Sequence, residues 1–344
     1  MDVNLEHRQR VTQMMRAYRE SQVLIACAEL AVFETLGSAS KTALDVARQV
    51  GVDASALARL MNAAVAVGLL EKDGEMYRNS PVGLACLAEP GPTYVGNLVR
   101  REGAFYRRWS RLTEAVQIGG RPVENVRDEG SNNWVREFQY ALYDLARTNG
   151  PSVAAALAPL LPQDRPARVI DIGGGHGGYS LALAKHYPGL EAIVFDLPPV
   201  QEVTEEIIAS EDMQAHVRMQ PGNFKSDELG SGYDLALLFG VLVSETQPDS
   251  VALLRKTHAA LNSGGWIVLR GFYLNRDRTG PLESTLFDLH MLLSTGAGGA
   301  HTLVELSAWL QEAGFLVPDI IQVSDPEQTR LLVAQKLLGH VLSI

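Results

Sequence analysis

The feature that most constrains the fold is the stretch VIDIGGGHGGYSLALAKHYP at residues 169–188, in which five glycines fall within six residues. An apolar run precedes these glycines and a helical pattern follows them. Glycine permits a positive φ and a close approach of the backbone to a ligand, and the first turn of a helix has free N–H groups. We therefore predict a strand, a tight ligand-binding turn and a helix, in that order.

From residue 168 onward, strand patterns alternate with helical patterns. This alternation predicts an α/β fold with a doubly wound, mostly parallel, Rossmann-like sheet, whose ligands bind at the carboxyl ends of the strands. The predicted strands are 168–172, 191–196, 216–220, 233–239 and 265–271, and two more strands are predicted around a turn in 318–336. The predicted helices are 178–187, 200–210, 248–261, 283–294 and 302–313.

The N-terminal part has a different, mostly helical pattern. Helices are predicted within 9–35. Residues 41–83 follow the order of a winged helix, which is helix, turn, helix and hairpin. Thr42 is the predicted cap of the first of these helices, Asp53 or Ser55 that of the second, and the hairpin is predicted to turn at Asp73-Gly74. A winged helix can bind DNA or can serve packing and dimerisation. The apolar second helix favours dimerisation. We expect a winged-helix dimerisation domain in 1–100, a helical linker contributing to the substrate pocket in 101–160, and the ligand-binding domain in 161–344.

Composition narrows the possible functions. The net charge of −10 disfavours a nucleic-acid partner. No apolar run reaches the length of about 20 residues that a membrane helix needs, and the N-terminus lacks a secretory signal, so we expect no membrane partner and a cytoplasmic location. Cys27 and Cys86 stand in apolar helical patterns without metal-ligand spacing, so we expect reduced thiols and no metal site.

Two ligands compete for the glycine turn. The spacing of Gly173, Gly175 and Gly178 also fits the fingerprint of a dinucleotide-binding oxidoreductase. However, Asp171 precedes the turn by two residues, where it would repel a pyrophosphate and attract an ammonium group. Asp196 ends the next strand and can accept hydrogen bonds from ribose hydroxyls. These two carboxylates favour a nucleoside with an amino-acid tail, S-adenosylmethionine.

At this point the chain resembles, over nearly its whole length, the small-molecule O-methyltransferases of plant and bacterial secondary metabolism. The resemblance rests on VIDIGGGHGGYSLALAKHYP, on VFDLPPV and on LFDLHMLLSTGAGGAHTLVELSAWLQEAGF together. It implies an N-terminal dimerisation domain, a homodimer, and a C-terminal domain that binds S-adenosylmethionine and releases S-adenosylhomocysteine. The implied cofactor residues are Asp171, Gly173, Gly175, Asp196, Leu197, Asn223, Phe224 and Phe239.

The sequence departs from this family where the family's base should stand. The position of the usual histidine base matches Val243, and a valine cannot accept a proton. The two acids that orient this base match Arg270 and Ala300. On the cofactor side, an acid near the adenine matches Asn223, which still offers an acceptor, and a basic residue matches Phe239.

Other residues are candidates for catalysis and substrate binding. His290 and Asp288 lie on the substrate helix, and Arg270 could anchor a carboxylate or a phenolate, so these three are the predicted catalytic residues. A histidine satisfied by its neighbours is the competing interpretation of His290. His301 and Glu245 are second candidates for the base, and His176 in the turn would contact the cofactor or cap the helix. The predicted substrate contacts are Phe138, Tyr143, Val243, Phe287, Met291 and Thr295.

Three functions remain open from the sequence. The first is methyl transfer to a small, largely apolar, aromatic acceptor that needs little help from a base, driven by positioning. The second keeps the cofactor for hydroxylation, decarboxylation or a pericyclic reaction. The third is a winged-helix regulator without catalysis, which the charge and the intact turn disfavour.

Overall fold

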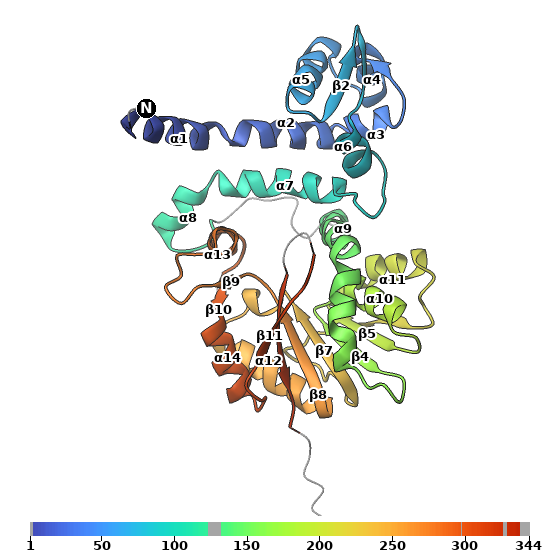
Figure 1. The fold of residues 1–344 in the computed structure, drawn as a ribbon, viewed down its shortest axis with the longest axis vertical. Helices are drawn as coiled ribbons and strands as arrows, with labels where there is room; N and C mark the ends of the chain where they lie inside the picture. The colour runs from blue at the N-terminus through green and yellow to red at the C-terminus, as the bar shows by residue number, and fades with distance from the viewer. Residues whose placement is uncertain (1–2, 123–131, 297, 326–328, 338–344) are drawn as a thin grey trace, which may run out of the picture. The chain divides into compact units, whose positions relative to one another are not determined.

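The computed structural model describes residues 3–122, 132–296, 298–325 and 329–337. The chain forms two compact units, Met1–Arg107 and Arg108–Ile344 (Figure 1). Residues 118–133, IGGRPVENVRDEGSNN, are rich in turn-forming residues, and most of them lie outside the described residues.

The first unit has the predicted winged-helix arrangement. Its helices are α1 (Val3–Arg16), α2 (Tyr18–Glu29), α3 (Val32–Leu36), α4 (Ala43–Val50), α5 (Ala54–Ala66), α6 (Pro81–Gly83) and most of α7 (Gly96–Trp109), and a π-helical turn η1 (Leu84–Ala88) follows α6. Its small antiparallel sheet has the order β1-β3-β2, from β1 (Lys41–Thr42), β2 (Leu70–Asp73) and β3 (Met76–Asn79).

Helix caps in this unit follow the sequence. Thr42 accepts a hydrogen bond from the Asp45 backbone N–H, and Asp53 accepts one from the Ala56 backbone N–H, so both predicted N-caps are confirmed. The predicted position of the hairpin turn is wrong by one residue. Asp73 still belongs to β2, and the turn consists of residues 74 and 75.

The second unit is built on a seven-stranded sheet of order β11-β12-β8-β7-β4-β5-β6. Its strands are β4 (Arg168–Ile172), β5 (Glu191–Asp196), β6 (Val217–Pro221), β7 (Tyr233–Phe239), β8 (Leu261–Arg270), β11 (Asp319–Gln322) and β12 (Arg330–Gln335). Strands β4 to β8 pair in parallel, and β12 joins β8 antiparallel. The strand order reverses between β4 and β7, so ligands are expected at the carboxyl ends of these two strands.

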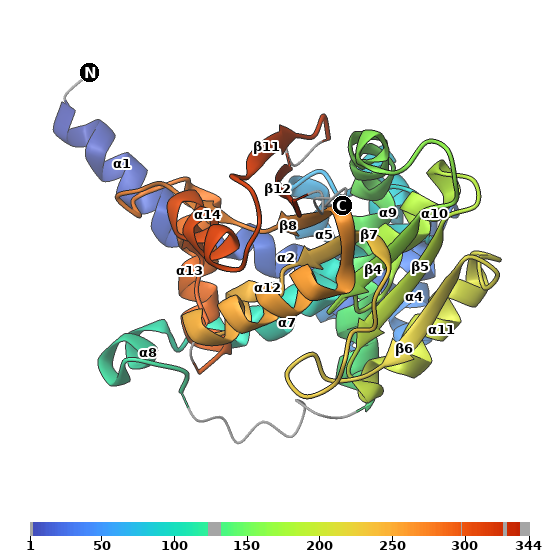
Figure 2. The same cartoon turned by 90° about the horizontal axis from the view of Figure 1, so that it is seen from below.

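Helices cover both faces of this sheet (Figures 1 and 2). One face packs against α9 (Asn132–Leu157), α10 (Gly178–His186) and α11 (Gln201–Ser210), and the other against α12 (Gln247–Ala260) and α14 (Leu303–Glu312). Alternate residues of each strand belong to the two cores. Val169 and Leu235 lie in the first core, whereas Ile170 and Ala236 lie in the second. Because both faces are buried there, the central strands β4, β5 and β7 are mostly apolar.

The remaining elements surround the carboxyl ends of the strands or connect the main elements. They are α8 (Leu112–Ile118), α13 (Leu282–Ser294), the parallel pair β9 (Tyr273–Leu274) and β10 (His301–Thr302), and the 3-10 turns η2 (Ala158–Leu160), η3 (Pro198–Val200) and η4 (Leu242–Ser244). The predicted strand 265–271 is four residues too short at its start and one residue too long at its end. Residue 261 already pairs with Tyr233, ahead of an irregularity in the β7–β8 register.

None of the helices in the described ranges combines the length and the apolar character that a membrane span requires. Within the same ranges, no group of three or more His, Cys, Asp or Glu side chains could hold a metal ion. Cys27 is buried, and burial raises the pKa of its thiol to about 12, so this side chain is an unreactive part of the core.

Candidate active site

The glycine turn joins β4 to α10 and requires glycine for two reasons. Gly173, Gly175 and Gly177 have φ of +67°, +50° and +68°, a region that other residues rarely adopt. Space is the second reason. A Cβ added at Gly173 would lie 2.7 Å from a methyl group of Val241, and one added at Gly175 would lie 2.4 Å from Oε1 of Gln139. The turn is therefore packed tightly by its neighbours.

Asp171 lies directly beneath this turn and is almost completely buried, with 2% of its surface exposed. Its carboxylate accepts a hydrogen bond of 2.8 Å from the Ser180 hydroxyl. Burial, together with the negative charge of Asp196, raises the pKa of Asp171 to about 7, although the hydrogen bond from Ser180 lowers it. A cation close to Asp171 would favour its ionised form, as the prediction of an ammonium-binding role requires.

Asp196 ends β5 beside the same turn. Its carboxylate accepts hydrogen bonds from the backbone N–H of Gly175, at 2.8 Å, and of Leu197, at 2.6 Å. Burial raises the pKa of Asp196, while these two N–H donors lower it. The Leu197 side chain is exposed. The turn and Asp196 are thus held in one arrangement at the carboxyl ends of neighbouring strands, as the sequence predicts.

His176 completes the turn as a helix cap. Its Nδ1 accepts a hydrogen bond of 2.9 Å from the backbone N–H of Gly178, the first residue of α10. Burial, together with the positive charge of Arg270, lowers the pKa of His176 to about 3. The ring is therefore neutral at physiological pH. Of the two roles expected for His176, the structure shows the capping role.

The predicted residues for the adenine side follow β6 and end β7. Asn223 binds within its own loop, because its Oδ1 accepts a hydrogen bond from the Lys225 backbone N–H and its backbone N–H donates to Asp227. Phe224 packs against the second core of the sheet. Phe239 forms an edge-to-face contact with Tyr179, with 4.9 Å between the ring centroids.

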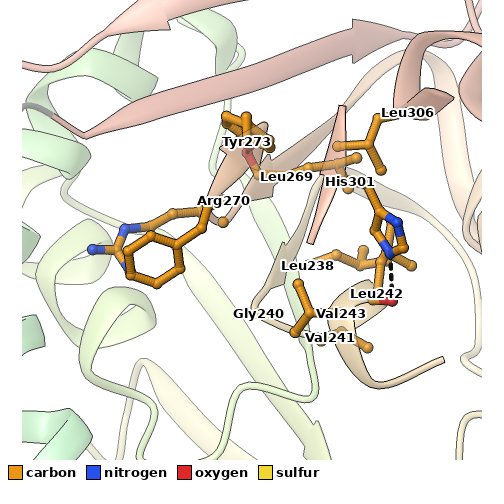
Figure 3. A pocket seen from close by; sticks show the side chains of 12 residues that line it. Leu238, Gly240, Val241, Leu242, Val243, Leu269, Arg270, Tyr273, His301 and Leu306 are labelled. Atoms are coloured by element: carbon orange, nitrogen blue, oxygen red, sulfur yellow. Dashed lines mark hydrogen bonds between the residues drawn. The ribbon is translucent and has the colours of Figure 1, made fainter. Parts of the chain in front are cut away.

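A small pocket lies at the carboxyl ends of β7 and β8 (Figure 3). Val243 and Arg270, which the sequence analysis matches to the family's base and to one of its acids, both line it. Its full lining is Leu238, Gly240, Val241, Leu242, Val243, Leu269, Arg270, Gly271, Phe272, Tyr273, His301 and Leu306. In Figure 3 the Arg270 side chain extends away from His301, and its guanidinium lies 5.3 Å from the ring centroid of Tyr179. The pocket is therefore apolar with one cation at its side.

The other candidates for the base have structural partners. His301 lies with its Nε2 3.2 Å from the Leu242 carbonyl oxygen (Figure 3). Asp288 accepts a hydrogen bond of 2.7 Å from the Ala300 backbone N–H, so it holds the glycine-rich loop that follows α13. Glu245 forms an ion pair with Lys225.

His290 is engaged at both ring nitrogens. The indole N–H of Trp109 donates to its Nδ1 at 3.3 Å, and its Nε2 lies 3.3 Å from the Ser294 hydroxyl oxygen. Because an indole N–H can only donate, Nδ1 must be the acceptor, and the neutral ring carries its proton on Nε2. This arrangement favours the interpretation of His290 as a histidine whose ring nitrogens already have hydrogen-bond partners within the protein, because Nδ1 is not free to accept a proton from a substrate.

Aromatic rings extend from the pocket along α13. Phe272, a pocket residue, stacks on Phe287 with 4.3 Å between the centroids, and Phe287 stacks on His290 with 6.1 Å. Met291 is buried on the same helix, and its Cε would lie 3.1 Å from a Cβ at Gly298. Gly299 donates its backbone N–H to the Val243 carbonyl oxygen. Phe287, Met291 and Val243 are thus brought to one region.

The other predicted substrate residues are more dispersed. Phe138 on α9 lies against Trp134, with 5.9 Å between the ring centroids. Tyr143 instead faces the glycine turn, 6.0 Å from the ring of His176, and donates its hydroxyl to Glu211. The Thr295 hydroxyl donates to the Met291 carbonyl oxygen and accepts from the Gly298 backbone N–H. Tyr143 therefore lies on the cofactor side of the predicted site.

Two residues near the site have contacts that the sequence analysis does not predict. Gln139 approaches the glycine turn from α9, and Trp109 holds His290 from the end of α7. The sequence predicts the helices that contain Gln139 and Trp109. The contacts of these two residues, however, depend on packing between segments that are distant along the chain.

Comparisons with known proteins agree with this geometry. Residues 127–316 match the model of the O-methyltransferase domain, and residues 12–89 match the O-methyltransferase dimerisation domain. The chain is 29% identical, over 88% of each sequence, to 3-hydroxy-5-methyl-1-naphthoate 3-O-methyltransferase of Streptomyces sahachiroi. It is 30% identical to the tetracenomycin polyketide synthesis 8-O-methyl transferase of Streptomyces glaucescens, over 92% of this chain and 94% of that one.

A solved structure is similar over the same length. The human N-acetylserotonin methyltransferase in complex with SAM superposes with a TM-score of 0.85 at 26% identity, covering 96% of this chain and 98% of that chain.

Proposed function

Because the chain belongs to the family of S-adenosylmethionine-dependent O-methyltransferases, we propose that it methylates an oxygen of a flat, largely apolar aromatic acceptor of natural-product type. Family membership confirms S-adenosylmethionine as the cofactor predicted from the glycine turn, in place of a dinucleotide. It also confirms the winged helix as a dimerisation domain. The relatives are methyltransferases by name, so they do not favour a non-methylating reaction.

The residues around the turn fit this cofactor. Asp196 can accept hydrogen bonds from the ribose hydroxyls, and Asp171 can become ionised beside the ammonium group. Gly173 and Gly175 adopt the positive φ values that give the turn its shape beside these two carboxylates. Bound S-adenosylmethionine supplies the electrophilic methyl group; the chain has to hold the acceptor oxygen in line with it, which can lower the barrier by about 7–11 kcal/mol.

The proposal for the acceptor rests on a row of stacked rings, those of Phe272, Phe287 and His290. Offset-stacked rings favour a flat aromatic ligand, and the adjoining pocket is apolar around Val243. The two Streptomyces relatives are named for a naphthoate and a tetracenomycin polyketide, which are fused aromatic systems. Phe138 and Met291 are proposed to complete this apolar surface.

We further propose that the acceptor reacts as a phenolate, without a histidine base. Val243 cannot take a proton, and Nδ1 of His290 is held by Trp109. A cation near a phenol lowers the pKa of the phenol. Arg270, at the side of the pocket, therefore takes the place of the missing base by stabilising the ionised acceptor. In this scheme His290 positions the acceptor and Asp288 positions the loop after α13.

The first test is product analysis. The protein is incubated with methyl-labelled S-adenosylmethionine and a panel of hydroxynaphthoates and hydroxylated polycyclic aromatics, while S-adenosylhomocysteine release is measured. The proposal predicts labelled aryl methyl ethers. Release of S-adenosylhomocysteine with the label on carbon or nitrogen would contradict oxygen as the acceptor atom.

The second test concerns the base. Two acceptors of the same shape are compared, one of which carries an electron-withdrawing group that lowers the pKa of its phenol. The acidic limb of the pH–rate profile should move with the pKa of the acceptor, and Arg270→Gln should shift this limb to higher pH. A limb at the same pH for both acceptors would instead indicate a titrating group of the protein.

We propose that the protein is a cytoplasmic homodimer whose first 100 residues supply the interface, with 101–160 as a linker to the substrate pocket. The dimerisation domain at residues 12–89 supports the dimer. Apolar side chains are exposed on α1 and at the start of α2, among them Leu5, Val11, Met14, Met15 and Tyr18, and a partner subunit would cover such a surface.

A further inference from the structure

We propose that Gln139 is a binding residue for S-adenosylmethionine, whose side-chain carbonyl oxygen accepts a hydrogen bond from the ammonium group at the methionine end of the cofactor. This inference rests on the identity of the cofactor and is independent of the acceptor.

The first observation is an unsatisfied acceptor. Gln139 is 7% exposed, and its Oε1 is buried without a hydrogen-bond partner. Buried polar atoms nearly always have a partner, because an unpaired buried acceptor is costly. An atom of this kind at the edge of a binding site indicates a donor that arrives with the ligand.

The second observation is the position of this oxygen. A Cβ built on Gly175 would lie 2.4 Å from Oε1 of Gln139, and a Cβ built on Gly174 would lie 2.8 Å from each carboxylate oxygen of Asp171. Two side chains with acceptor oxygens therefore lie against consecutive glycines of the turn. Gln139 comes from α9 above the turn, whereas Asp171 comes from the end of β4.

The chemistry of the donors selects the ammonium group. S-adenosylmethionine offers donors at its ribose hydroxyls, its adenine amino group and its ammonium. The ribose is assigned to Asp196, and the adenine to the loops after β6. An ammonium group has three N–H donors and needs several acceptors. A buried carboxylate together with an amide oxygen meets this need without adding a third negative charge beside Asp171 and Asp196.

The test uses calorimetry with two ligands, S-adenosylhomocysteine and 5′-methylthioadenosine. Both contain the adenine and the ribose, but 5′-methylthioadenosine lacks the amino-acid end. Gln139→Met preserves the length of the side chain and removes the acceptor. We expect this variant to bind S-adenosylhomocysteine about 10- to 100-fold more weakly, as the loss of a hydrogen bond to a charged group implies, and to bind 5′-methylthioadenosine as the wild type does.

Tyr140→Phe is the matched control. It changes the next residue of α9, where the hydroxyl donates to Glu206 on the exposed side, and it should leave both affinities unchanged. Without ligand, Gln139→Met should unfold at the wild-type temperature or above it, because it removes an unsatisfied buried acceptor. Unchanged affinity for S-adenosylhomocysteine in Gln139→Met would overturn the proposal. Equal weakening of both ligands would also overturn it, since it would assign the contact to the nucleoside.

Discussion

Replacing Asp171 by asparagine should stabilise the protein without cofactor and weaken its cofactor binding. The side chain is buried beneath the glycine turn, and its pKa is raised from an ordinary value of 3.8 to about 7. Asparagine has nearly the same shape and can still accept the hydrogen bond from Ser180. The substitution therefore removes the titration of residue 171 while largely preserving the packing.

The size of the change in stability follows from the linkage between folding and proton binding at Asp171. Well below pH 3.8 the carboxyl group is protonated in both the folded and the unfolded state. Between pH 4 and 7 the unfolded state releases this proton while the folded state keeps it, so wild-type stability falls as pH rises and levels off above about pH 7. At about 1.4 kcal/mol per pKa unit, the loss reaches about 4 kcal/mol at pH 8 and only about 2 kcal/mol at pH 5. The stability advantage of Asp171→Asn should therefore grow by about 2–3 kcal/mol between these two pH values.

Urea unfolding without cofactor at several pH values between 5 and 8 measures this difference. Titration with S-adenosylhomocysteine at pH 8 measures the opposite effect, since the variant lacks the charge that attracts the ammonium group. With saturating ligand the wild type should regain part of the lost stability by mass action. A stability difference that stays constant or shrinks with rising pH would refute the reasoning, because it would show that Asp171 is ionised in the folded protein at ordinary pH.

Three further outcomes test the site and the assembly. Asp196→Ala should weaken S-adenosylhomocysteine binding by about 10- to 100-fold in calorimetry, because the ribose hydroxyls lose a charged acceptor; unchanged affinity would remove Asp196 from the site. His290→Phe keeps a ring beside Phe287 but loses both hydrogen bonds, so it should raise KM and leave the acidic limb of the pH profile in place; loss of that limb would make His290 the base. Light scattering should give twice the 37.4 kDa mass of one chain, and a monomer at micromolar concentration would count against the dimer.

The sequence predicts the central strands of the sheet well because they are buried on both faces. Strands β4, β5 and β7 begin and end at the predicted residues, and β6 is displaced by one residue. In β5 and β7 an apolar run ends at Asp196 and at Gly240, respectively, which marks the boundary clearly. The sequence does not predict the start of β8, because residues 262–265 have the composition of a turn and yet belong to the strand, where the backbone of Gly264 and Gly265 is hydrogen-bonded to that of Lys336.

The site was predicted where neighbours in sequence create it. The turn at 173–178, Asp171 and Asp196 follow from strand ends that parallel pairing brings together. The surroundings of His290 could not be predicted in this way, because its partner Trp109 is 181 residues distant along the chain. The same limit applies to Gln139, whose closeness to Gly175 depends on how α9 packs over α10.

If Val243, Arg270 and Ala300 stand at the positions of the family's base and its two acids, as we propose, the charges around the site explain why all three are replaced together. A histidine that takes a proton becomes a cation, and acids beside it stabilise that cation. Without the histidine, these acids would be buried charges without a partner, which is costly. Arginine at position 270 reverses the local charge, so the pocket favours an acceptor that already carries a negative charge. An ionised acceptor can then interact favourably both with Arg270 and with the positive sulfonium of the cofactor, and it needs no proton transfer in the reaction itself.

By this reasoning, restoring only a histidine, as in Val243→His, should not add a functioning base, because Arg270 would disfavour the protonated imidazole. The double variant Val243→His with Arg270→Glu is the one expected to gain a pH-dependent base, and a single Val243→His variant with such a base would contradict the role given to Arg270.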